Sequence, residues 1–135
     1  MIIKIEHLGI AVKDVSSSKS LFSKLLGKDA YKEEPVESEA VNTIFYELGE
    51  AKLELLEATD PSSAIAKYLE KNREGIHHLA LLVDDIYAEM KRLQELGFTF
   101  INDAPKKGAD NKLIAFIHPK SANGILLELC QEITE

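Results

Sequence analysis

The sequence predicts an α+β fold in which two tandem βαβββ modules form a curved eight-stranded sheet around a metal-binding groove. Three observations lead to this prediction. Two stretches of the chain repeat one order of elements, each repeat opens on an apolar strand that carries a histidine, and each repeat closes on a strand with a glutamate between leucines. A chain of 135 residues has the ordinary length of a single domain.

The repeat is visible when two segments are aligned. "HLGIAVKDVSSSKSLFSKLLG" (residues 7–27) matches "HLALLVDDIYAEMKRLQELG" (residues 78–97), so that His7 falls on His78. We therefore expect two tandem modules within a single domain, because internal repeats of this kind mark repeated structural units. The expected division of residues 1–135 is module 1 at about 1–59, a linker helix at about 60–74 and module 2 at about 75–135.

Each module is expected to begin with a strand and a helix. The strands alternate and end at Asp14 and Asp85, which are suitable N-caps for the helices that follow. Gly27 and Gly97 stop these helices. The apolar residues at helical spacing are Leu21, Phe22, Leu25 and Leu26 in the first copy, and Ile86, Met90, Leu93 and Leu96 in the second.

Three further strands are expected after each helix. The linker "DPSSAIAKYLEKNREG" predicts a helix with Asp60 or a neighbouring serine at its N-cap and Gly75 at its end. The expected strands cover 29–35, 41–49 and 51–58 in the first module, and 98–102, 111–118 and 124–131 in the second.

Strand alternation separates the two histidines of "GIHHLALLVDD". Consecutive side chains on a strand point to opposite faces, so His78 shares a face with Ala80 and Leu82. In the first module, His7 likewise stands beside the small residues Gly9 and Ala11. His78 is therefore the repeated histidine, and His77 faces away, in a structural role or at a subunit contact.

The last strand of each module adds a glutamate. Glu54 in "KLELLE" and Glu128 in "ILLELCQ" stand between leucines, where an ionised carboxylate is costly unless it is paired, hydrogen-bonded or bound to a cation. If both modules present the same face to one groove, two imidazoles and two carboxylates converge there. This predicts a metal site made of His7, Glu54, His78 and Glu128. The mixed nitrogen and oxygen set suits Co, Mn, Ni or Fe better than a closed structural zinc site.

Composition excludes several classes of function. The formal net charge of -7 argues against non-specific binding of nucleic acid, and the single cysteine excludes a disulfide within the chain. No apolar run is long enough to span a bilayer, and the amino end lacks the pattern of a signal peptide. We expect a cytoplasmic protein that binds a small ligand, without nucleic-acid or membrane partners.

Four motifs together resemble one known family. "HLGIAVKD", "KLELLE", "GIHHLALLVDDI" and "FIHPKSANGILLEL" are similar to the methylmalonyl-CoA epimerases of the vicinal oxygen chelate superfamily, over essentially the whole chain. The resemblance implies a divalent metal held by His7, Glu54, His78 and Glu128. It implies an acyl-CoA thioester substrate, and interconversion of (R)- and (S)-methylmalonyl-CoA by α-proton abstraction through an enolate. A homodimer is the expected assembly.

The resemblance also suggests the proton-transfer groups. Glu128 matches a family glutamate that is both metal ligand and catalytic base. Some members carry a second glutamate on the third strand, but the matching position here is Thr43, which cannot act as a carboxylate base. Glu39 and Glu47 lie nearby in sequence, before that strand and at its end. The second base is therefore left open.

The segment "APKKGADNKLIAFIHPK" carries a local positive balance in an acidic chain. Its lysines could meet the phosphates of a CoA carrier, or they could form only a solvated rim. His118 matches the "HPK" stretch of the family and is expected to orient a loop or line the pocket. The weaker candidate substrate-binding residues are Lys106, Lys107, Lys112, His118 and Lys120.

Three other functions remain open at this point. A glyoxalase I type lactoylglutathione lyase would use the same metal and a similar proton transfer. A ring-cleaving dioxygenase would use two histidines and one carboxylate on Fe(II), against which the additional ligand Glu54 argues. A metal-free small-molecule binding module of the same fold would have no reason to retain all four polar side chains.

Overall fold

The computed structural model describes residues 1–134 and consists of two compact units. Unit 1 contains residues 1–7 and the chain from His78 onward, and unit 2 contains Leu8–His77. Strands β1 (Ile2–Val12) and β5 (Gly75–Val83) each run from one unit into the other. The units therefore differ from the expected sequence modules, because the first seven residues group with the second half of the chain.

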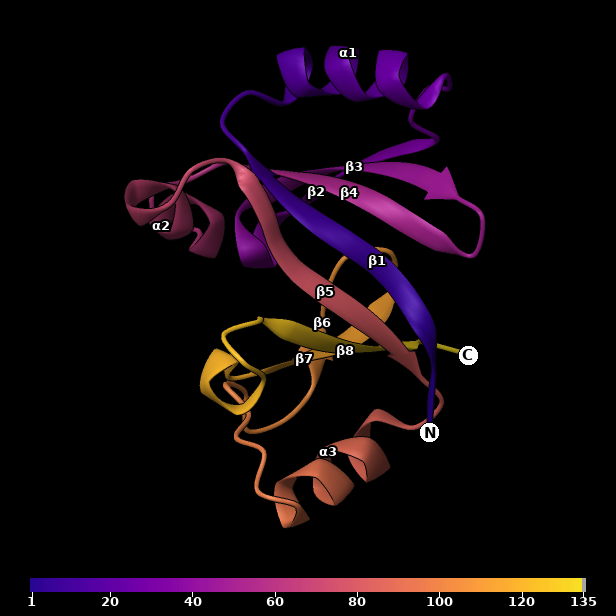
Figure 1. Cartoon of the computed structure of the whole chain (residues 1–135), viewed down its shortest axis with the longest axis vertical. Coiled ribbons are helices and arrows are strands. Elements are labelled where there is room, and N and C mark those ends of the chain that lie inside the picture. The colour runs from indigo at the N-terminus through magenta and orange to yellow at the C-terminus, as the bar shows by residue number, and fades with distance from the viewer. Residues whose placement is uncertain (135) are drawn as a thin grey trace. The chain divides into compact units, whose positions relative to one another are not determined.

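The strands confirm the predicted α+β class and the count of eight. Their order in the sheet is β2-β3-β4-β1-β5-β8-β7-β6 (Figure 1). Strand β8 pairs with β5 in parallel and with β7 in antiparallel register, and β3 pairs with β2 and β4 in antiparallel register. The remaining strands are β2 Lys32–Val36, β3 Val41–Leu48, β4 Ala51–Ala58, β6 Lys106–Lys107, β7 Lys112–Ile117 and β8 Leu127–Glu132.

Both repeated helices begin at the predicted caps. Helix α1 (Val15–Leu26) starts at Asp14, whose carboxylate accepts a hydrogen bond from the Ser16 N–H, and ends at Gly27 with φ 70°. Helix α3 (Ile86–Glu95) starts at Asp85, whose carboxylate accepts from the Ala88 N–H. Helix α1 also ends as predicted, whereas α3 ends at Glu95 with Leu96 as its C-cap, one residue before Gly97. No helix within residues 1–134 is both long enough and apolar enough to cross a bilayer.

The linker helix is shorter than predicted. Helix α2 covers Ala64–Lys71, and Ser63 is its N-cap, with its hydroxyl accepting a hydrogen bond from the Ile65 N–H. The prediction that Gly75 ends this helix is wrong. The helix ends before the extended residue Asn72, and Gly75 opens β5 instead.

The prediction of a strand over 98–102 is also wrong. Phe100 makes one isolated bridge to Ile117, and the pairing goes no further. The side-chain oxygen of Asn102 accepts the Phe116 N–H at 2.8 Å, which takes the place of a strand-to-strand backbone bond. On the side of β7 away from β8, the strand that pairs with it is the two-residue β6.

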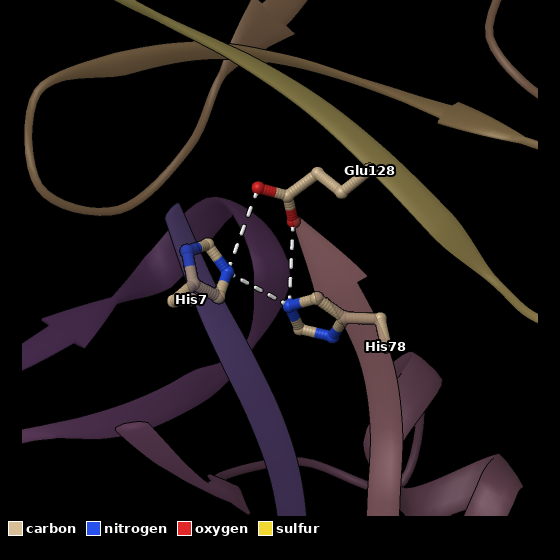
Figure 2. A group of neighbouring side chains, drawn as sticks. All are labelled: His7, His78 and Glu128. Carbon is tan, nitrogen blue, oxygen red and sulfur yellow. Dashed lines mark hydrogen bonds and ion pairs between the residues drawn. The ribbon is translucent and has the colours of Figure 1, made fainter. Parts of the chain in front are cut away.

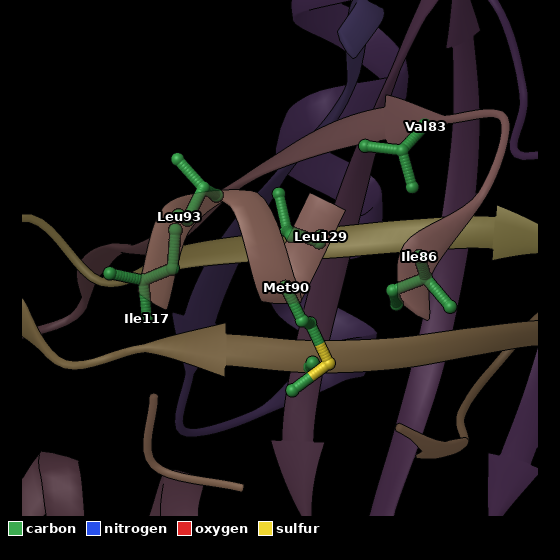
Figure 3. Close-up of a cluster of buried hydrophobic side chains, with 7 residues drawn as sticks. Val83, Ile86, Met90, Leu93, Ile117 and Leu129 are labelled. Carbon is green, nitrogen blue, oxygen red and sulfur yellow. The ribbon is translucent and has the colours of Figure 1, made fainter. Parts of the chain in front are cut away.

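Each unit has its own apolar core, on the helix side of its strands. In unit 1, α3 packs on β5, β7 and β8 through the residues drawn in Figure 3. In unit 2, α1 packs on β1, β3 and β4. The buried members are Val83, Ile86, Met90, Leu93, Ala115, Ile117 and Leu129 in unit 1, and Val12, Ile44, Tyr46 and Leu55 in unit 2.

We expect Leu129→Ala to destabilise the protein by about 2–5 kcal/mol, because Leu129 is fully buried and the substitution leaves a cavity. Leu96→Ala is the matched control, since Leu96 has the same side chain at 66% exposure and should cost no more than about 0.5 kcal/mol. Urea unfolding followed by circular dichroism measures both. Similar losses for the two variants would contradict the assignment of the unit 1 core.

Candidate active site

Three of the predicted site residues come together in unit 1. His7 ends the unit 1 part of β1, His78 begins the unit 1 part of β5, and Glu128 lies on β8. The parallel register pairs Glu128 with Ala80, which shares a face with His78. Leu129 packs towards α3 from the opposite face. The strand alternation inferred from the sequence therefore directs Glu128 away from the core and towards the histidines.

The polar atoms of this cluster face one another at short distances (Figure 2). Nε2 of His7 lies 3.0 Å from Nε2 of His78. The Glu128 carboxylate spans both rings, with Oε2 at 3.6 Å from Nε2 of His7 and Oε1 at 3.4 Å from Nε2 of His78. All three side chains are buried. Two imidazoles and one carboxylate thus present their ligand atoms to a common point.

These residues fit a divalent metal ion. Protein ligands bind such ions at about 2.0–2.2 Å, so two ligand atoms that subtend 90–120° at one ion stand about 2.8–3.8 Å apart. The three separations in the cluster, 3.0, 3.4 and 3.6 Å, lie in that range. Buried carboxylates are costly without a cation or hydrogen-bond donors, and a bound cation would offset this cost. The mixed donor set is compatible with Co, Mn, Ni or Fe.

One residue of the site was missed by the sequence analysis. Glu6, which precedes His7 on β1, is buried, and its Oε1 lies 2.8 Å from Nδ1 of His7. The sequence did contain a signal. By strand alternation, Glu6 lies on the same face as Leu8 and Ile10, where the pattern of this strand would favour an apolar residue over a carboxylate.

The surroundings of the cluster are apolar. The ring of Phe116 meets the ring of His78 edge to face, with the ring centroids 5.9 Å apart. Ala80, Ile114 and Cys130 form a small buried cluster, against which Leu82 and Phe116 pack. Ala80 and Cys130 lie on the same strand faces as His78 and Glu128. Charges in this low-dielectric setting interact more strongly than they would in water.

The other predicted ligand, Glu54, lies in unit 2. It is buried on β4, opposite Phe45 of β3, and it stays a predicted ligand. Thr43 on β3 is fully buried, and its hydroxyl has no hydrogen-bond partner among residues 1–134. Glu39 is half-buried in a 3-10 turn before β3, and Glu47 is exposed near the end of that strand. Both carboxylates stay candidates for the second base.

The two remaining histidines have other partners. His77 belongs to unit 2, where its ring meets the ring of Tyr68 on α2 edge to face at 4.9 Å. Burial lowers the pKa of His77 below its usual value, which favours the neutral imidazole. Nδ1 of His118 accepts the Lys120 N–H at 3.1 Å and so caps a short 3-10 helix, Pro119–Ser121.

The four lysines differ in their surroundings. Lys106, Lys107 and Lys120 are exposed. Lys112 is buried, and its Nζ lies 3.0 Å from Oδ2 of Asp110. Lys112 therefore differs from the other three candidate lysines, because its ammonium group is enclosed and paired with a carboxylate.

Comparison with known proteins identifies the family. The model of the Glyoxalase/Bleomycin resistance protein/Dioxygenase superfamily matches residues 6–116. The chain belongs to this superfamily. The ethylmalonyl-CoA/methylmalonyl-CoA epimerase of Cereibacter sphaeroides is 38% identical over 97% of this chain and 99% of the relative. The mitochondrial methylmalonyl-CoA epimerase of Dictyostelium discoideum is 40% identical over 93% of this chain and 76% of the relative.

Solved structures lead to the same family. A variant of Streptomyces coelicolor methylmalonyl-CoA epimerase, in complex with 2-nitronate-propionyl-CoA, superposes with a TM-score of 0.94 at 30% identity. The match covers 99% of this chain and all (100%) of the other. Within the superfamily, the chain therefore belongs with the methylmalonyl-CoA epimerases, which confirms the family expected from its motifs.

Proposed function

We propose that this protein is a metal-dependent epimerase that interconverts (R)- and (S)-methylmalonyl-CoA. The observation that carries the proposal is the buried cluster in which the Glu128 carboxylate faces Nε2 of both His7 and His78. The names of the relatives supply the substrate class, since they act on methylmalonyl-CoA and one was solved with a CoA thioester analogue.

In this proposal His7, His78 and Glu128 hold the ion, with Glu54 as the fourth ligand. A bound divalent ion would supply a Lewis acid that stabilises the charge developing on the thioester oxygen when the α-proton leaves. The apolar surroundings of Phe116 and Ala80 keep water away and strengthen these electrostatic interactions.

Glu128 is the proposed proton-transfer base. Its carboxylate takes the proton from the α-carbon, and the substrate becomes a planar enolate that has lost its configuration. Epimerisation is completed when a proton is delivered to the opposite face of that carbon. Thr43 cannot be the second carboxylate, so Glu39, Glu47 or a bound water are the candidates for this step.

The CoA carrier adds a second requirement. We assign its phosphates to the exposed amino groups of Lys106, Lys107 and Lys120, since these lysines are accessible on an otherwise acidic chain. His118, which caps the turn that contains Lys120, would set the position of that lysine. A cytoplasmic location and a homodimeric state complete the proposal.

We expect the Co²⁺- or Mn²⁺-loaded protein to exchange the α-proton of methylmalonyl-CoA with deuterium from the solvent and to form both epimers. Mass spectrometry measures the label, and chiral analysis measures the epimers. The matched control is the same protein treated with a chelator. Its rate of exchange should fall by at least about 100-fold, because the Lewis acid is removed. Activity confined to methylglyoxal plus glutathione would reject the epimerase and select the lactoylglutathione lyase.

A further inference from the structure

We propose that Glu6 is a positioning residue that holds the His7 ring in the orientation and tautomer required for metal ligation. This inference rests on the proposed metal-dependent function. It assigns a role to a buried carboxylate that none of the sequence motifs included. Glu6 and His7 both belong to unit 1, as do His78 and Glu128.

The hydrogen bond between the two neighbours carries the inference. Oε1 of Glu6 lies 2.8 Å from Nδ1 of His7, and an ionised carboxylate can only accept a hydrogen bond. With Glu6 ionised, Nδ1 is the donor of this bond and carries the proton. In a neutral imidazole this leaves the lone pair on Nε2, which is the atom that faces His78 and Glu128. The bond thus selects the tautomer whose free nitrogen points into the cluster.

The burial of Glu6 supports a specific role. Only 4% of Glu6 is exposed. By strand alternation it shares a face with the apolar residues Leu8 and Ile10. Another buried carboxylate of unit 1, that of Glu89, faces a cation, because its Oε2 lies 2.7 Å from Nε of Arg92. The Glu6 carboxylate bonds to the ring of a proposed ligand. Carboxylates that orient metal-bound histidines in this way change metal affinity by about 10–100-fold.

The test compares Glu6→Ala, which removes the acceptor, with Glu6→Gln, whose amide oxygen can still accept from Nδ1–H. Glu89→Gln is the matched control, since it neutralises a buried glutamate of the same unit outside the cluster. Co²⁺ affinity is measured by competition with a chelator, and the visible absorption of bound Co²⁺ reports its coordination. In the metal-free proteins, ¹⁵N NMR of the histidine rings at pH 8.5 reports which nitrogen of His7 carries the proton.

We expect Glu6→Ala to bind Co²⁺ about 10–100-fold more weakly, with the Co²⁺ spectrum retained, and Glu6→Gln to recover most of that loss. Glu89→Gln should bind as the parent does. In the metal-free parent, the His7 proton should reside on Nδ1, and in Glu6→Ala it should redistribute towards Nε2.

Three results would overturn the inference. The first is an unchanged Co²⁺ affinity in Glu6→Ala. The second is a Co²⁺ spectrum that both Glu6 substitutions alter, which would make Glu6 itself a ligand. The third is a His7 proton that resides on Nε2 in the parent protein. A parent protein that binds no Co²⁺ would refute the proposed function. The ¹⁵N measurement on the metal-free proteins would then still decide whether Glu6 orients His7, so the two failures are distinguishable.

Discussion

Replacing His78 with alanine is expected to abolish both metal binding and α-proton exchange, whereas replacing His77 with alanine should preserve both. Nε2 of His78 lies 3.0 Å from Nε2 of His7 and 3.4 Å from Glu128, so its loss removes one donor of the cluster. Loss of a group that orients a metal-bound histidine already weakens metal binding by about 10–100-fold, so we expect loss of a direct ligand to weaken it by more than about 100-fold.

The neighbouring histidine is the natural control. His77 packs on Tyr68 of α2, in the other unit, and its removal changes the same residue type one position away. Metal content by mass spectrometry and deuterium exchange into methylmalonyl-CoA are measured on both variants, and circular dichroism shows that each is folded. Equal loss of metal from both variants would show that the assignment of faces by strand alternation is wrong.

Glu128→Gln is expected to keep the metal and to lose proton exchange from at least one epimer. The amide oxygen of glutamine can still bind a cation, but it cannot accept the substrate proton at neutral pH. Removal of a general base slows such reactions by about 10²–10⁴-fold. Exchange is therefore followed separately from each epimer, at a Co²⁺ concentration that saturates the variant.

The two epimers make this measurement informative about the second base. If only one epimer stops exchanging, Glu128 serves one face of the α-carbon and another group serves the opposite face. Parallel substitution of Glu39 and Glu47 by glutamine then tests both carboxylate candidates for that group. Normal exchange from both epimers of Glu128→Gln would contradict the assignment of Glu128 as a base.

Local patterns were sufficient for most of the secondary structure. The caps at Asp14 and Asp85 depend on residues within one helical turn, and the alternation around His78 depends on immediate neighbours. These interactions are short in sequence, so they can be predicted from sequence. One failure occurred where a distant partner competed. The side chain of Asn102 bonds β7 and prevents the strand expected over 98–102 from continuing.

The sequence by itself determined the repeat, the face on which each histidine stands and the family, and it named three residues that the structure brings together. Only the tertiary structure decided that Glu6 bonds to the His7 ring and that Lys112 is enclosed beside Asp110. The physical reason is that the alternation of side chains along a strand determines only which face each side chain occupies. The atom that the side chain contacts on another residue depends on strand register, rotamers and burial.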